Sequence, residues 1–222
     1  MSDREPMNPH LAMLVSKIYD GALAPVHRQD LYTSTLTDET IAEQFIRSVP
    51  PAMIPKLLGA SWEQVQSALL FPFRSPSGGF MSHVRVKIFP TLTDADGHTV
   101  KYLQPPRTGP RLYFVARCLA EVCEGMAPLW VVEGEKKSLA VAQLGYPTVG
   151  ICGVEGWHVG GSRNLLDDFS AIKLAGRTVN VIPDGDYKTN PNVYRAMHRF
   201  GTALRLHGAD PFVVLLPSEL AR

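Results

Sequence analysis

The chain has 222 residues, of which 45% are hydrophobic and 19% are charged, and its formal net charge is +1. This composition is typical of a globular protein and excludes a low-complexity chain. No apolar run approaches the roughly 18 residues that cross a bilayer, and the N-terminus lacks the apolar core of a signal peptide. We therefore expect a cytoplasmic protein without a membrane partner. The three cysteines fit neither a disulfide framework nor a zinc site.

The first segment, residues 1–68, has the pattern of a polar helical region. Thr37 stands where its side chain can cap a helix over residues 37–48. A short helix interrupted by prolines is expected to end near Gly59, and residues 61–70 are expected to begin another helix.

The second segment, residues 69–127, changes to the period-two pattern of β-strands. Strands are predicted at residues 69–73, 80–90, 98–103 and, as a short addition, 111–116. Apolar residues alternate with His83, Arg85 and Lys87, so the predicted antiparallel sheet has one apolar and one basic face. Between residues 74 and 117 the chain has seven basic and two acidic residues. This excess fits either a phosphate-binding face or an ordinary solvated face.

The third segment, residues 128–222, alternates strands with helices. Strands are predicted at residues 128–133, 147–152, 178–184 and 211–217, and helices at 135–145, 162–176 and 190–208. Such alternation predicts a parallel sheet with helices on both faces. The whole chain is therefore expected to combine an α/β part with a preceding α+β part.

Carboxylates follow two of the predicted parallel strands. Glu133 ends the first, and Asp184 and Asp186 stand at the end of the third. Ligands bind beyond the carboxyl ends of parallel strands, and three crowded carboxylates need a cation. Oxygen ligands without histidine or cysteine indicate Mg²⁺ or Mn²⁺. Taken singly, each carboxylate also has an ordinary explanation, since Asp184 can cap a helix and Glu133 can form a salt bridge.

Lysines accompany these acids at an unusual position. Lys136 and Lys137 fall in the first turn of the predicted helix 135–145, where the helix dipole disfavours cations. Their presence there indicates a negatively charged partner.

The acidic pattern resembles the TOPRIM domain of bacterial-type primases, type IA and type II topoisomerases and certain nucleases. The stretches "VEGEKK", "GVEGW" and "PDGD" are similar to the Toprim-like domains of primase–helicase proteins of phages, plasmids and integrative elements. This part of the resemblance spans roughly residues 128–217. It implies a TOPRIM-type parallel sheet in which Glu133, Asp184 and Asp186 are the catalytic and metal-binding residues.

The segment before it resembles the N-terminal part of the bacterial primase core. The stretch "KYLQPP" corresponds to an element that lines the groove for template and nucleotide, and Arg85 corresponds to an arginine that follows a hairpin there. The two resemblances together cover about two-thirds of the chain. They imply three parts: a helical segment at 1–68, a basic sheet subdomain at 69–127 and a TOPRIM-like domain at 128–222.

The resemblance implies a DNA primase core: a metal-dependent nucleotidyltransferase that makes short RNA primers on single-stranded DNA from nucleoside triphosphates. Glu133 is alternatively a general base. The residues expected to contact nucleotide or DNA are Arg85, Lys87, Lys101, Arg111, Lys136, Lys137 and Lys188. The expected context is replication of a phage or mobile element, with a helicase domain or helicase partner.

Some features depart from the family pattern and keep two alternatives open. Lys137 stands where bacterial primases usually carry an acid, the acidic cluster beyond the last strand is reduced to Glu219, and no cysteine precedes Cys118 to form a zinc ribbon. The alternatives are a TOPRIM nuclease and a non-catalytic module that binds single-stranded DNA. The abrupt end leads us to expect a fragment of a longer protein.

Overall fold

The computed structural model describes residues 9–59, 64–160, 162–185 and 187–216. The chain divides into two compact units. The first comprises residues 1–75 and 79–108, and the second comprises residues 76–78 and 109–222. In the part of the chain that the structure describes, no helix is long and apolar enough to cross a membrane.

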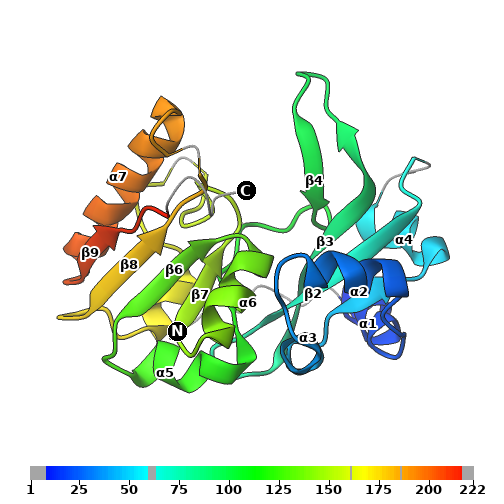
Figure 1. Ribbon diagram of the computed structural model, residues 1–222, viewed down its shortest axis with the longest axis horizontal. Coiled ribbons are helices and arrows are strands. Elements are labelled where there is room, and N and C mark those ends of the chain that lie inside the picture. Colours follow the sequence, from blue (N-terminus) through cyan, green and yellow to red (C-terminus); the bar gives the residue numbers. More distant parts are fainter. Residues whose placement is uncertain (1–8, 60–63, 161, 186, 217–222) are drawn as a thin grey trace. The chain divides into compact units, whose positions relative to one another are not determined.

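The first unit contains a four-stranded antiparallel sheet (Figure 1). Its strands lie in the order β1 (Arg47–Val49), β2 (Ser67–Arg74), β3 (Phe80–Thr93) and β4 (Thr99–Leu103). The turn at residues 75–79 joins β2 to β3, and a backbone hydrogen bond of 2.8 Å from Ser75 N–H to the Gly79 carbonyl closes it. The strands that the alternating pattern predicted between residues 69 and 103 are thereby confirmed.

Helices pack on both faces of this sheet. Helices α1 (Pro9–Tyr19) and α4 (Ile54–Leu58) share a core with the face that carries Val84, Val86 and Ile88. Helix α2 (Pro25–Tyr32) lies over the other face, because Asp30 contacts Lys87 and the ring of His27 stacks on Phe89 at 4.8 Å. The predicted basic face is therefore partly covered. The reason is visible in β2, whose continuous apolar run is buried on both sides.

Two predicted helix signals in this unit are confirmed and one is wrong. The Thr37 side chain caps α3 (Asp38–Glu43) by accepting the Thr40 N–H, and Gly59 ends α4 with a left-handed φ of 69°. The helix expected over residues 61–70 fails from Ser67 onward, because those residues pair with β3 as strand β2. Residues 61–63 lie outside the described part of the chain.

The second unit contains a five-stranded sheet in the order β5-β7-β6-β8-β9. Its strands are β5 (Tyr113–Phe114), β6 (Leu129–Glu133), β7 (Thr148–Ile151), β8 (Thr178–Ile182) and β9 (Asp210–Val213). The last four are parallel, as predicted. The short strand expected within residues 111–116 forms, but it pairs with β7 as an antiparallel edge instead of joining the first sheet.

Helices cover both faces of the second sheet. Helix α6 (Glu135–Gln143) packs on one face of the sheet, where the Ser138 side chain lies close to Gly150 of β7. Helices α5 (Leu119–Glu124) and α7 (Pro191–Leu206) contribute to the core on the opposite face, around Val131 and Val149. The fold class is thus confirmed: a mostly parallel sheet with helices on both faces, beside a separate unit with an antiparallel sheet.

The helix predicted over residues 162–176 is wrong. Within the described residues of that stretch, helical structure is limited to a short 3₁₀ turn, η3 (Asp167–Ala171). The Asp168 carboxylate accepts hydrogen bonds from the Arg111 guanidinium and from the Leu112 backbone N–H, which tie the segment to the start of β5. These tertiary contacts outweigh a helical propensity of a few tenths of a kcal/mol per residue.

Candidate active site

Glu133 and Asp184 meet at the carboxyl edge of the second sheet. Glu133 is the last residue of β6, and Asp184 stands two residues after the end of the neighbouring parallel strand β8. The backbone N–H of Asp184 donates to Glu133 Oε2 at 3.1 Å. The sequence prediction that these segments converge is therefore matched by the geometry, whereas Asp186 lies outside the described residues.

Local backbone geometry explains why Glu133 stands at this edge. Gly134 follows it with a φ of 91°, a conformation that side chains other than glycine rarely adopt, and its N–H donates to the Ile151 carbonyl at 2.9 Å. Helix α6 begins at Glu135. The strand thus stops abruptly at Glu133, and the helix start lies directly beside the carboxylate.

A lysine contacts one of the two acids. Lys137, in the first turn of α6, makes an ion pair with the Asp184 carboxylate, and the side chains are 51% and 48% exposed, respectively. Lys136 is half-buried in the same turn, and Lys188 is exposed in the segment after Gly185. Of these three lysines, Lys137 is the one whose contact with an acid of this edge is shown.

The acids at this edge fit a hard divalent cation by the chemistry of their donor atoms. Glu133 and Asp184 offer carboxylate oxygens, which Mg²⁺ and Mn²⁺ prefer. The ion pair of Asp184 with Lys137 is half-exposed, and such pairs contribute only about 0–1 kcal/mol. Because the lysine stem is flexible, the pair leaves Asp184 able to exchange Lys137 for another cation.

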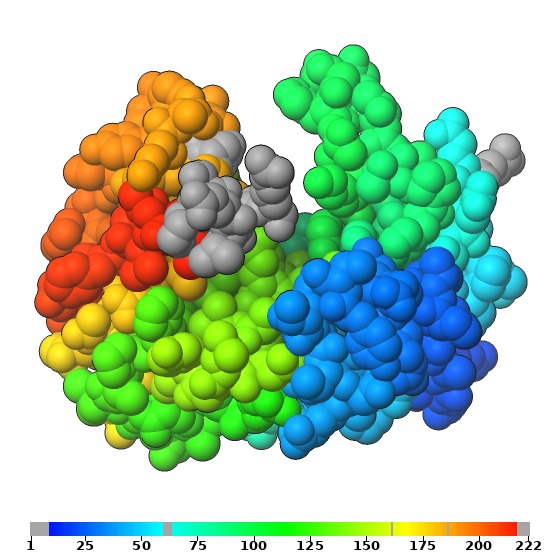
Figure 2. Space-filling model, viewed as in Figure 1, coloured from blue at the N-terminus to red at the C-terminus, as the bar shows by residue number. Residues whose placement is uncertain are grey.

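A second acidic group lies in the first unit. Asp94, Asp96 and His98, all exposed at the turn between β3 and β4, have ligand atoms within 4.8 Å of one another. Asp94 Oδ1 accepts the backbone N–H groups of Asp96 and His98 at 3.0 and 2.8 Å. This carboxylate shapes the turn, whose hairpin projects from its unit (Figure 2).

The basic residues predicted in the first sheet are not all gathered together. The Arg85 guanidinium lies 5.2 Å from the ring centroid of Tyr102, while Lys101, which precedes Tyr102 in β4, points to the opposite face. Lys87 pairs with Asp30 at 2.5 Å, and both side chains are less than one-fifth exposed. Lys101 is thus exposed, Arg85 is half-buried beside Tyr102, and Lys87 is engaged within the unit.

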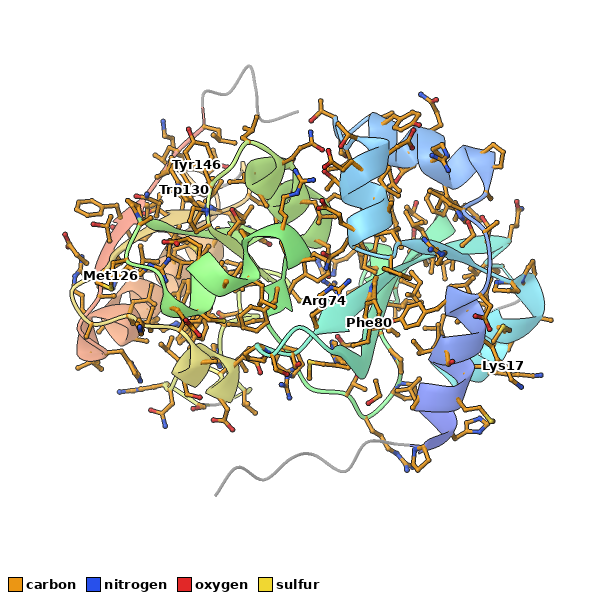
Figure 3. All side chains as sticks on the ribbon, turned by 90° about the horizontal axis from the view of Figure 1, so that it is seen from below. Lys17, Arg74, Phe80, Met126, Trp130 and Tyr146 are labelled. Carbon is orange, nitrogen blue, oxygen red and sulfur yellow. The ribbon has the colours of Figure 1, made fainter. Side chains whose placement is uncertain are left out.

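Another arginine of this unit lies beside an aromatic ring. The Arg74 guanidinium stands 4.2 Å from the ring centroid of Phe80, whose side chain is 39% exposed (Figure 3). Arg74 also donates to the Glu43 carbonyl at 2.9 Å.

Arg111 is placed in a structural contact. Its Nε donates to Asp168 Oδ2 at 2.9 Å and its Nη2 to Asp168 Oδ1 at 2.5 Å, and the Asp168 side chain is only 6% exposed. A bidentate pair with a buried carboxylate leaves little of this guanidinium for a nucleotide. The geometry gives no support to the predicted nucleotide contact of Arg111.

The loop after β7 contains residues whose roles the sequence analysis missed. Gly153 has a φ of 89°, and Trp157 is buried in the core. Between them Glu155 contacts the Arg199 guanidinium of α7 and lies 2.9 Å from His158 Nε2. The spacing of Arg195 and Arg199 on a predicted helix was the signal that could have identified this cluster.

A family model described as a domain of unknown function (DUF3854) matches residues 120–222. No curated protein matches the chain.

Solved structures of bacterial primases share the fold. The catalytic core of DnaG superposes with a TM-score of 0.60 at 22% identity, covering 94% of this chain and 71% of that one. The Aquifex aeolicus primase, with its zinc-binding and RNA polymerase domains, gives 0.66 at 15% identity, covering 98% of this chain and 58% of that one. The RNA polymerase domain of Mycobacterium tuberculosis DnaG in complex with double-stranded DNA gives 0.64 at 18% identity, covering 100% and 76%. The chain has the fold of a bacterial-type primase catalytic core, which confirms the fold that the resemblance implied.

Proposed function

We propose that this chain is the catalytic core of a DNA primase that joins nucleotides into short RNA primers on a single-stranded DNA template. The observation that carries the proposal is the meeting of Glu133 and Asp184 at the carboxyl edge of neighbouring parallel strands. It occurs in a fold that solved primase cores match over most of the chain. Fold alone does not define an activity, so the proposal depends on the residues of the site.

The residues at this edge suit phosphoryl transfer, which depends mainly on positioning and on neutralising charge. Glu133, Asp184 and Asp186 would hold Mg²⁺ or Mn²⁺, which supplies Lewis-acid stabilisation of the phosphates and lowers the pKa of an attacking hydroxyl. Lys136, Lys137 and Lys188 would bind the phosphates of the incoming nucleoside triphosphate. In the first unit, Arg85 and Lys101 would contact template or nucleotide.

The biological setting is proposed from the same resemblance. The stretches "VEGEKK" and "PDGD" resemble those of primase–helicase proteins of phages and mobile elements. We therefore propose a role in replicating such an element in the cytoplasm, with a helicase domain or partner that supplies the single-stranded template.

Incorporation of labelled nucleotides on single-stranded DNA tests the proposal. The wild type, with Mg²⁺ or Mn²⁺, is expected to make short labelled products from nucleoside triphosphates. Glu133→Gln and the double variant Asp184→Asn/Asp186→Asn are expected to lower the rate by at least about 100-fold, because each removes charge that the metal needs. Asp94→Asn/Asp96→Asn, which removes two acids elsewhere, is the matched control and is expected to keep the rate. Activity that survives in the first two variants would remove the proposed site.

One contact favours a second candidate, a non-catalytic module that binds single-stranded DNA. The ion pair of Lys137 with Asp184 places a cation of the protein where a metal is expected. If this candidate holds, the wild type synthesises nothing and binds an oligonucleotide equally well with EDTA. Metal-dependent nicking of a supercoiled plasmid, without nucleotide incorporation, would instead identify a TOPRIM nuclease.

A further inference from the structure

A hollow lies between helix α7 and the loop that follows β7. Its volume is about 690 Å³, within the range of ligand sites. Its lining residues are Glu155 from the loop and Asn192, Tyr194, Arg195, His198 and Arg199 from α7. All of them belong to the second unit. This group, called the α7 pocket below, has no part in the site described above.

The fold presents a basic and aromatic surface to this pocket. Helix α7 buries Val193, Ala196, Met197 and Phe200 in the core, and its opposite side is exposed and carries Tyr194, Arg195, His198 and Arg199. Tyr194 is 52% exposed, and its ring centroid lies 5.5 Å from that of Tyr187. The outer turns of α7, coloured orange, are visible at the molecular surface in Figure 2.

Neighbouring groups hold the two arginines of the pocket in place. The Arg195 guanidinium donates from Nη2 to Asn192 Oδ1 at 2.7 Å and from Nε to the Pro191 carbonyl at 3.2 Å. Arg199 is oriented by its ion pair with Glu155. A guanidinium carries five donor hydrogens, so each arginine keeps donors for a ligand after these contacts. Such fixed side chains lose less conformational freedom when they bind.

The α7 pocket lies along the same edge as the candidate active site. Its Glu155 loop follows β7, whose Ile151 is in register with Glu133. Helix α7 begins at Pro191, after the segment that starts at Asp184. The acids therefore stand at the carboxyl ends of β6 and β8, and the Glu155 loop of the pocket begins at the carboxyl end of β7, all within one unit.

We infer that the α7 pocket binds a single strand of nucleic acid beside the candidate active site. Arg195 and Arg199 would contact successive phosphates, and Tyr194 would stack on a base. Guanidinium groups beside an exposed aromatic ring are the combination that binds single strands without reading their sequence. The inference rests on the proposed function only in taking that strand to be the template or the product.

Binding of a fluorescein-labelled oligo(dT) to the whole chain, without metal or nucleotides, tests the pocket separately from catalysis. Arg195→Gln/Arg199→Gln is expected to weaken binding by at least about tenfold, because charged hydrogen bonds to phosphate are lost. The negative slope of log affinity against log salt concentration should become shallower by about 0.7 for each lost phosphate contact. Lys173→Gln/Arg205→Gln removes the same charge from exposed positions outside the pocket and is expected to keep both values.

Tyr194→Ala gives a second, independent signature. It is expected to weaken binding about fivefold or more through lost stacking while leaving the salt slope unchanged. Because Tyr194 is exposed, circular dichroism should show the wild-type fold.

The outcomes separate this inference from the proposed function. If the pocket variants bind like the Lys173→Gln/Arg205→Gln control, or if the wild type does not bind the oligonucleotide, the pocket inference is overturned, whatever the synthesis assay shows. If an acidic peptide of oligo-glutamate competes as well as oligo(dT), the nucleic-acid assignment is also overturned. If binding weakens as expected but the wild type makes no primer, the pocket stands and the catalytic proposal fails.

Discussion

At the scale of single residues, Glu133 shows how a charge comes to end a buried strand. Val131 and Val132 before it are fully buried, whereas Glu133 stands at the edge and accepts the Asp184 N–H. A carboxylate is costly in a sheet interior but can be satisfied at a rim that offers backbone donors and lysines. The sequence pattern placed the residue correctly. The contact of Lys137 with Asp184 was not predictable, because it depends on how α6 sits against the loop after β8.

Arg111 pairs with Asp168, and this contact predicts a structural role for the residue. Arg111→Ala is expected to lower the free energy of unfolding by about 2–4 kcal/mol, because Asp168 would keep a buried charge without its bidentate partner. Urea unfolding measures this loss. Replacing both partners, as in Arg111→Met/Asp168→Leu, should be less damaging than Arg111→Ala alone. An Arg111→Ala variant as stable as wild type, with weaker nucleotide binding, would restore the original prediction.

His27 makes stability depend on pH. It is buried, with Nδ1 2.7 Å from Ser48 Oγ and Nε2 3.1 Å from Ser67 Oγ, and burial lowers its pKa below the usual 6.5. As the pH falls below 6.5, the His27 imidazole takes up a proton more readily in the unfolded chain than in the folded protein. The free energy of unfolding is therefore retained above pH 6.5 and decreases below it. Thermal unfolding between pH 8 and 5 should show a decreasing midpoint.

The matched variants for this effect are His27→Gln and His98→Gln. His98 is 78% exposed, so its replacement is expected to keep the wild-type pH dependence, whereas His27→Gln should flatten it. Equal slopes in wild type and His27→Gln would contradict the assignment.

At the scale of elements, the loop after β7 shows what the "GVEGW" stretch does. Gly153 adopts a left-handed conformation, and Gly156 comes so close to Cys152 that an added Cβ would lie 2.7 Å from its backbone. This tight turn lets Trp157 enter the core while Glu155 faces α7. The glycines are thus needed to hold one wall of the α7 pocket.

Gly156→Ala tests the tight turn. The variant is expected to be destabilised by about 1–3 kcal/mol, because the clash is with backbone that cannot move aside. Gly160→Ala is the control, since an added Cβ there meets nothing within 4 Å and should change stability by less than about 0.5 kcal/mol. Chemical denaturation of both variants measures the difference, and equal stabilities would show that the turn tolerates a side chain.

Other elements show where sequence patterns succeed and fail. Helix α7 and the parallel strands were predictable because each has a long periodic or apolar run bounded by glycine or proline. The helix over residues 61–70 was wrong because strand pairing with β3 decided the structure of Ser67 onward. The helix predicted over residues 162–176 was wrong because the contact of Asp168 with Arg111 fixes this segment as the short 3₁₀ turn η3. Both errors come from partners distant in sequence.

At the scale of the whole molecule, the change of pattern from alternating to α/β predicted two sheets. The structure divides near residue 108, and β5 belongs to the second sheet. This assignment was not predictable, because the sequence of a short edge strand does not show which sheet it joins. The three-part division at 1–68, 69–127 and 128–222 stays a prediction. The meeting of Glu133 and Asp184 at one edge was predictable from the ends of their strands, whereas the α7 pocket forms where the loop after β7 meets α7, which the sequence does not show.

Binding of Mn²⁺, followed by the electron paramagnetic resonance signal of the free ion, directly tests whether Glu133 and Asp184 form a metal site. The wild type is expected to bind Mn²⁺, and Glu133→Gln/Asp184→Asn is expected to weaken binding by at least about tenfold. Asp94→Asn/Asp96→Asn, which removes the same number of carboxylates from the exposed turn, should bind like wild type. Undiminished binding in the first double variant, or its loss in the second alone, would contradict a metal site formed by Glu133 and Asp184.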